Sequence, residues 1–112
     1  MERLDGRVAV VTGAGGGIGR VTAQRLAAKG CHLALVDLRP DGLAETARLV
    51  AAQGRRASTH LADVGDAEAM AALPDEVRER HDVVHILVNN AGITSVGPFA
   101  EERLEDMRAL VD

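Results

Sequence analysis

The chain has 112 residues, of which 46% are hydrophobic, and it carries a formal net charge of −4 at pH 7. It contains no Trp, no Tyr and one Phe, which excludes an aromatic stacking platform for single-stranded nucleic acid and any mechanism that takes a tyrosine phenol from these residues. The charge balance gives no basic footprint for nucleic acid, and the single cysteine excludes an internal disulfide framework.

The length predicts one domain over residues 1–112. No apolar stretch approaches the roughly 20 residues of a membrane-spanning helix. The N-terminus also lacks the long apolar region of a secretory signal peptide. We therefore expect a cytoplasmic protein.

Short apolar runs alternate with helical periodicity along the chain. Strands are predicted over residues 8–11, 32–37, 57–62 and 83–88. Helices are predicted over 17–29 and 41–52, from 66 onward, and over 101–112. Asp41 and Asp66 are the expected N-caps of the second and third helices. Pro74 is expected to break or kink the third.

This alternation predicts an α/β fold, a doubly wound parallel sheet with helices on both faces and strand order 3-2-1-4. Such sheets usually continue to five or six strands, and an apolar edge strand is prone to aggregate. We therefore interpret the 112 residues as the first part of a larger domain. A complete small flavodoxin-like domain is the alternative.

A glycine-rich segment lies between the first predicted strand and the first predicted helix. Glycines at 13, 17 and 19 fit the pattern Gly-x-x-x-Gly-x-Gly. The Gly-x-Gly-x-x-Gly pattern fails, because Ile18 and Arg20 occupy its third glycine position in the two possible registers. Glycines let the backbone approach a ligand, and a helix N-terminus favours a pyrophosphate. Taken alone, the segment could also be a flexible loop.

Asp37 ends the second predicted strand. A carboxylate there can accept hydrogen bonds from an adenosine ribose and would repel a 2′-phosphate, which favours NAD over NADP. Arg39 could weakly counter that repulsion. A helix-cap or loop carboxylate is the alternative interpretation.

Polar residues also follow the third and fourth predicted strands. Asp63 and Val64 could flank an adenine, although Asp63 could equally be a turn residue. Asn89 and Asn90, followed by Ala-Gly, come after the fourth strand, where their amides can bind neighbouring backbone groups.

Taken together, these segments resemble the short-chain dehydrogenase/reductase family over essentially the whole chain. The resemblance implies a Rossmann-type fold, here truncated after the fourth strand. It also implies a nicotinamide cofactor, NAD, and hydride transfer between it and an alcohol or carbonyl substrate. It also implies that Asn89 ties the central sheet together. The residues implied to bind the cofactor are Gly13, Gly16, Gly17, Ile18 and Gly19 at the pyrophosphate, Asp37 at the adenosine ribose, Asp63 and Val64 at the adenine, and Asn90 along the cofactor.

The chain departs from this family in its catalytic residues. Members resemble one another in a Ser and a Tyr-x-x-x-Lys pair beyond the fourth strand, whereas this chain has no Tyr and only Lys29. No catalytic residue is therefore assigned, and the 112 residues alone are predicted to be inactive. His85 stands where an Asp is common. No metal site is predicted from the four histidines.

Two other functions remain open at this stage. One is a non-catalytic NAD-binding module or gene fragment, and the other is an S-adenosylmethionine-dependent methyltransferase. A full-length dehydrogenase is expected to act on a small-molecule substrate as a homo-oligomer, without nucleic acid or membrane partners.

Overall fold

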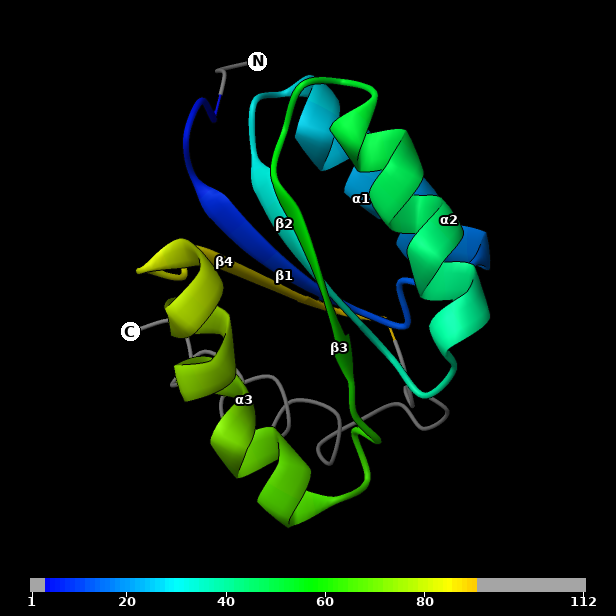
Figure 1. Ribbon diagram of the computed structural model, residues 1–112, viewed down its shortest axis with the longest axis vertical. Coiled ribbons are helices and arrows are strands. Elements are labelled where there is room, and N and C mark those ends of the chain that lie inside the picture. The colour runs from blue at the N-terminus through cyan, green and yellow to red at the C-terminus, as the bar shows by residue number, and fades with distance from the viewer. Residues whose placement is uncertain (1–3, 91–112) are drawn as a thin grey trace, which may run out of the picture.

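The structure is a computed structural model that describes residues 4–90, and the predicted helix over 101–112 lies outside them. Strands and helices alternate as predicted from the sequence (Figure 1). The elements are β1 (Val8–Thr12), α1 (Gly17–Ala28), β2 (His32–Asp37), α2 (Pro40–Ala51), β3 (Ala57–Leu61), α3 (Ala67–His81) and β4 (Ile86–Asn89).

The four strands form one parallel sheet in the order β3-β2-β1-β4, which confirms the predicted topology. Helices α1 and α2 cover one face and α3 covers the other (Figure 1). Strand β1 is buried at all five positions, as expected for a central strand covered on both faces. Within residues 4–90, no helix has the length and apolar character needed to cross a bilayer.

Each face of the sheet has its own apolar core. Beneath α1 and α2, the fully buried side chains include Val11, Leu33 and Leu35 from the strands. Beneath α3, Val10 and Val36 pack against Leu73 and Val77. Strand residues therefore alternate between two cores, which fixes the register of the sheet.

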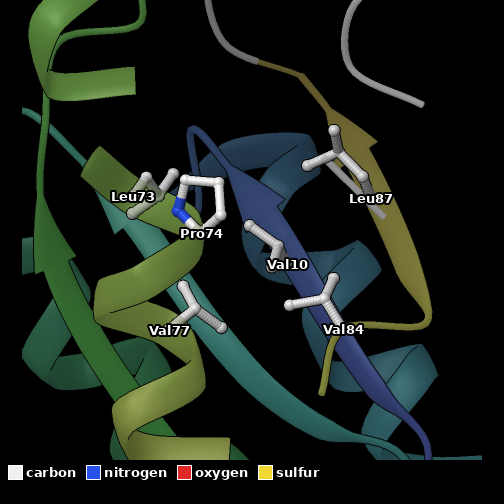
Figure 2. Close-up of a pocket in the computed structure, with 6 residues that line it drawn as sticks. All are labelled: Val10, Leu73, Pro74, Val77, Val84 and Leu87. Carbon is white, nitrogen blue, oxygen red and sulfur yellow. The ribbon is translucent and has the colours of Figure 1, made fainter. Parts of the chain in front are cut away.

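An apolar hollow lies between α3 and the β1–β4 side of the sheet (Figure 2). The side chains of α3 face those of the strands across it, and none of the lining side chains is polar or ionisable. The hollow therefore belongs to the packing of α3 on the sheet. It is lined by Val10, Leu73, Pro74, Val77, Val84 and Leu87.

The first residues of α2 and β4 differ from the sequence predictions. Helix α2 begins at Pro40 with Arg39 as its N-cap, so the prediction that Asp41 caps it was wrong. Proline suits the first helical position, because its φ is fixed and its missing N–H would have no partner there. Strand β4 begins at Ile86 rather than at 83, because Asp82, with a φ of 69°, turns the chain after α3.

Helix α3 runs through Pro74 without interruption, so a break at this residue is wrong, while a kink there stays a prediction. A proline removes one backbone hydrogen bond from the helix. Leu73 and Val77, both buried against the sheet, flank it and hold the two halves of the helix in place.

Asp66 caps α3 as predicted, since its side chain accepts hydrogen bonds from the backbone N–H groups of Glu68 and Ala69. We expect Asp66→Ala to lower the free energy of unfolding by about 1 kcal/mol, because those two N–H groups lose their acceptor. Urea denaturation would measure this change. Asp41→Ala, which removes a carboxylate without a capping role, should cost less than about 0.5 kcal/mol. Equal losses in the two variants would contradict the capping role.

A buried chain of polar side chains joins β3 to α3. Ser58 Oγ lies 2.7 Å from His60 Nε2 and 2.8 Å from His81 Nε2, and His60 Nδ1 lies 2.6 Å from Glu76 Oε1. Ser58, His60 and His81 are buried, whereas the side chain of Glu76 is half-exposed. We call these four residues the Ser–His cluster.

The Ser–His cluster has one hydrogen-bonding order that leaves no buried donor without an acceptor. A carboxylate accepts, so His60 donates from Nδ1 to Glu76 and accepts from the Ser58 hydroxyl at Nε2. Ser58 then accepts from His81 Nε2–H. This leaves His81 Nδ1 as a buried acceptor with no hydrogen-bond partner among the described residues. Protonating His81 would place an unpaired donor and a charge there. Burial, followed by the positive charge of Arg56, lowers its pKa to about 4.

Candidate functional site

The predicted site residues meet at the carboxyl edge of the sheet. The parallel register aligns Thr12 with Val36 and with Asn89, and aligns Asp37 with Leu61. The loops after all four strands therefore leave the sheet at this edge, which is where open α/β sheets bind their ligands.

The glycine-rich loop joins β1 to α1 at this edge. In the described part of the chain, no side chain caps the N-terminus of α1, and its first turn contains no acidic residue. The first-turn N–H groups and the positive end of the helix dipole therefore suit an anionic ligand. Ile18 projects beside them with 75% of its surface exposed.

The glycines of this loop differ in their surroundings. A Cβ on Gly19 would overlap the carbonyl oxygen of Gly13, and a Cβ on Gly15 would lie 2.7 Å from Asp37 Oδ2. By contrast, a Cβ on Gly16 or Gly17 would meet no atom of residues 4–90 within 4 Å. Gly19 is therefore required by backbone packing within the chain, whereas a side chain at Gly15 would displace the Asp37 carboxylate. Gly16 and Gly17 border open space that a ligand could fill.

Asp37 connects the end of β2 to the glycine-rich loop. Its Oδ2 accepts a hydrogen bond from the Gly15 N–H at 2.8 Å. Its Oδ1 accepts from the backbone N–H groups of Leu38 at 2.6 Å and Arg39 at 3.4 Å. Both oxygens are thus oriented by backbone donors, and the half-buried carboxylate lies beside the loop, as the predicted ribose contact requires.

The predicted residues after β3 lie in the turn that leads to α3. Asp63 is exposed, and its Oδ1 accepts a hydrogen bond from the Gly65 N–H at 2.8 Å. Val64 is half-buried in the same turn. Asp63 therefore does act as a turn residue, and its second carboxylate oxygen makes no hydrogen bond within the turn that would prevent a ligand contact.

A tight set of hydrogen bonds joins the ends of β1 and β4. The Thr12 hydroxyl lies 2.6 Å from Asn89 Oδ1, and Thr12 Oγ1 accepts from the Asn90 N–H at 3.1 Å. Asn89 therefore ties the central strands together, as the resemblance implied. The Asn90 Nδ2 group is buried without a hydrogen-bond partner among the described residues.

Two residues to which the sequence assigned no role at the site, Arg20 and Thr46, hold the glycine-rich loop. Arg20 donates from Nη2 to the carbonyls of Gly15 at 2.8 Å and Gly42 at 3.0 Å, and from Nε to Thr46 Oγ1 at 2.9 Å. The fully buried Thr46 hydroxyl lies 2.7 Å from the Ala14 carbonyl. A polar residue on the buried face of a predicted helix was the one available signal for Thr46.

His32 and His85 accept hydrogen bonds from the backbone, whereas His60 and His81 belong to the Ser–His cluster. Val8 N–H donates to His85 Nδ1 at 3.0 Å, so His85 supplies an acceptor at the position where the family often has Asp. His32 Nδ1 accepts from the Arg56 N–H, and burial followed by the Arg56 charge lowers its pKa. Among residues 4–90, no three His, Cys, Asp or Glu side chains are placed to hold a metal ion.

Comparison with known proteins agrees with this geometry. The family model described as short chain dehydrogenase matches residues 7–112. An oxidoreductase of Mycobacterium tuberculosis, SadH, is 41% identical over 112 residues, which are 100% of this chain and 41% of SadH. The match favours the dehydrogenase resemblance over the methyltransferase alternative.

Two solved structures are similar to the chain and carry different cofactors. A carveol dehydrogenase from Mycobacterium avium in complex with NAD is 36% identical, with a TM-score of 0.77, over 87% of this chain and 39% of that one. A metagenomic short-chain oxidoreductase in complex with NADP is 34% identical, with a TM-score of 0.74, over 87% of this chain and 47% of that one. The chain thus spans less than half the length of each of these proteins.

Proposed function

The chain belongs to the short-chain dehydrogenase family, and from this premise we propose that it binds NAD at the carboxyl edge of its sheet. The observation that carries the proposal is the Asp37 carboxylate, held 2.8 Å from the Gly15 N–H beside the uncapped N-terminus of α1. In this position it can accept hydrogen bonds from a ribose while the loop receives a pyrophosphate.

The remaining assignments divide a dinucleotide among the loops. Gly13, Gly16, Gly17, Ile18 and Gly19 would hold the pyrophosphate. Asp63 and Val64 would flank the adenine, and the unpaired Nδ2 of Asn90 would donate along the cofactor. A bound NAD would supply the hydride acceptor for oxidation of an alcohol, or in its reduced form the donor for reduction of a carbonyl.

We propose that the described residues bind and orient the cofactor without carrying the proton-transfer step. The sequence has no Tyr, and its one Lys, Lys29, is the C-cap of α1, at the end of that helix remote from the glycine-rich loop. Residues 1–112 would then form an NAD-binding Rossmann domain, the N-terminal part of a larger dehydrogenase domain in a full-length cytoplasmic homo-oligomer. A non-catalytic NAD-binding module is the second candidate, because the absence of Tyr and the position of the one Lys support it equally.

A test of the cofactor choice is the titration of the chain with NAD and NADP. We expect NAD to bind at least about tenfold more tightly, because Asp37 would repel a 2′-phosphate. Asp37→Asn should narrow that ratio by lifting the repulsion. Asp41→Asn removes an equal charge from an exposed site in α2 and should leave the ratio unchanged. Tighter binding of NADP by the unmodified chain would overturn the proposal.

A further inference from the structure

We propose that Arg20 and Thr46 are positioning residues that hold the peptide groups of the glycine-rich loop in the orientation that receives a pyrophosphate. The inference rests on the proposed dinucleotide binding and extends it to two side chains on the inner side of the loop.

Two carbonyl groups of the glycine-rich loop have side-chain donors within the chain. The Ala14 carbonyl lies 2.7 Å from the Thr46 hydroxyl, and the Gly15 carbonyl lies 2.8 Å from Arg20 Nη2. Both partners lie on helices packed against the inner side of the loop, Arg20 on α1 and Thr46 on α2. The two carbonyls are therefore directed toward these helices.

The directions of these two carbonyls also set the directions of the N–H groups in the same peptides. The described chain has no cis peptide bonds, and in a trans peptide the N–H points opposite to the C=O. Fixing the Ala14 carbonyl directs the Gly15 N–H to Asp37, which accepts it at 2.8 Å. Fixing the Gly15 carbonyl turns the Gly16 N–H away from Arg20. A Cβ on Gly16 would meet no atom of the described residues within 4 Å, so the chain leaves room for a ligand beside this peptide.

The side chains of Arg20 and Thr46 are bonded to each other and act as one unit. Thr46 Oγ1 accepts from Arg20 Nε at 2.9 Å while its hydroxyl serves Ala14, and Arg20 Nη2 also reaches the Gly42 carbonyl at 3.0 Å. A Cβ on Gly42 would overlap the Gly15 carbonyl oxygen, so α2 begins in direct contact with the loop. Losing either side chain would leave a loop carbonyl without its donor at this contact.

Binding of ADP and of adenosine to the purified chain tests this proposal, with Thr46→Val against Thr46→Ser as the matched pair. Valine has the shape of threonine without the hydroxyl, whereas serine keeps the hydroxyl. We expect Thr46→Val to weaken ADP binding roughly tenfold, on the order of one lost hydrogen bond, and to change adenosine binding less than about twofold. Thr46→Ser should bind both ligands as the unmodified chain does.

Arg20→Lys separates positioning from charge. The planar guanidinium of Arg20 contacts Thr46 and two carbonyls at once, whereas the ammonium of lysine keeps the positive charge but cannot make all three contacts. We expect it to weaken ADP binding as Thr46→Val does. ADP affinity equal to that of the unmodified chain in both variants would overturn the proposal. An equal loss of ADP and adenosine binding would also overturn it, because that pattern indicates a general structural role.

Hydrogen exchange without ligand keeps the inference separate from the proposed function. The Ala14 N–H donates to the Val36 carbonyl and the Gly15 N–H to Asp37, so exchange of both amides reports opening of the loop. We expect Thr46→Val and Arg20→Lys to speed their exchange roughly tenfold, with the amides of β2 unchanged. Unchanged exchange would overturn the positioning role. Failure of the unmodified chain to bind ADP or NAD would overturn the proposed function even if the exchange rates respond as expected.

Discussion

The free energy of unfolding should fall by about 3 kcal/mol on account of His81 alone when the pH is lowered from 7 to 4. Its pKa is about 4 in the folded chain, against an ordinary value of 6.5. Between these values the unfolded chain binds a proton that the folded chain excludes, so stability is retained above about pH 6.5 and is lost as the pH falls toward 4. The physical cause is the burial of His81 with Nδ1 unpaired.

Urea denaturation at a series of pH values, compared between the unmodified chain and His81→Gln, would isolate this effect. Glutamine does not titrate, and its Nε2 can donate to Ser58 Oγ as the histidine Nε2 does. The variant should therefore lose most of the pH dependence. His85→Asn removes a histidine outside the Ser–His cluster, so this variant should keep the pH dependence of the unmodified chain. Identical pH profiles for the unmodified chain and His81→Gln would contradict the account.

Gly19→Ala should destabilise the chain by roughly 3 kcal/mol and abolish measurable NAD binding. The added Cβ would overlap the Gly13 carbonyl oxygen and lie 3.1 Å from the Ala14 Cα, and neither backbone atom can move without displacing the loop. Thermal or urea unfolding, followed by NAD titration, would measure both losses.

Gly16→Ala is the matched control within the same loop. Gly16 has an extended backbone, with φ of 175°, and its Cβ would meet no atom of the described residues within 4 Å. The free energy of unfolding of the Gly16→Ala variant should therefore stay within about 1 kcal/mol of that of the unmodified chain. NAD binding should weaken roughly tenfold, because the methyl group would occupy space assigned to the pyrophosphate. A folded, NAD-binding Gly19→Ala chain would show that the loop does not pack as described.

The loop and the strand order could be predicted because their signals are contiguous in sequence. Glycines at 13, 17 and 19 lie close together in the sequence, Gly13 directly after β1 and the other two in the first turn of α1. The alternation of strands with helices predicts a parallel sheet. Asp66 was identified as a cap because its acceptor role needs only the next three residues.

The hydrogen bonds that Arg20 and Thr46 make to each other and to the loop could not be predicted in this way, because they depend on how α1 and α2 pack. The two residues are 26 positions apart, and neither side chain shows its partner in the sequence. For the Ser–His cluster, a period of two places Ser58 and His60 on one face of β3, but their pairing with His81 depends on where α3 lies on the sheet. Pro74 does not break α3 because packing on both sides of it outweighs one lost hydrogen bond.

The central claim is that the carboxyl edge of this sheet is an NAD site, and an NMR titration of the backbone amides with NAD tests it most directly. The account predicts saturable shifts concentrated in residues 13–19, at Asp37, at 63–64 and at 89–90, with the amides of α3 unaffected. Shifts concentrated around the apolar hollow beneath α3, or no saturable shifts at all, would contradict it.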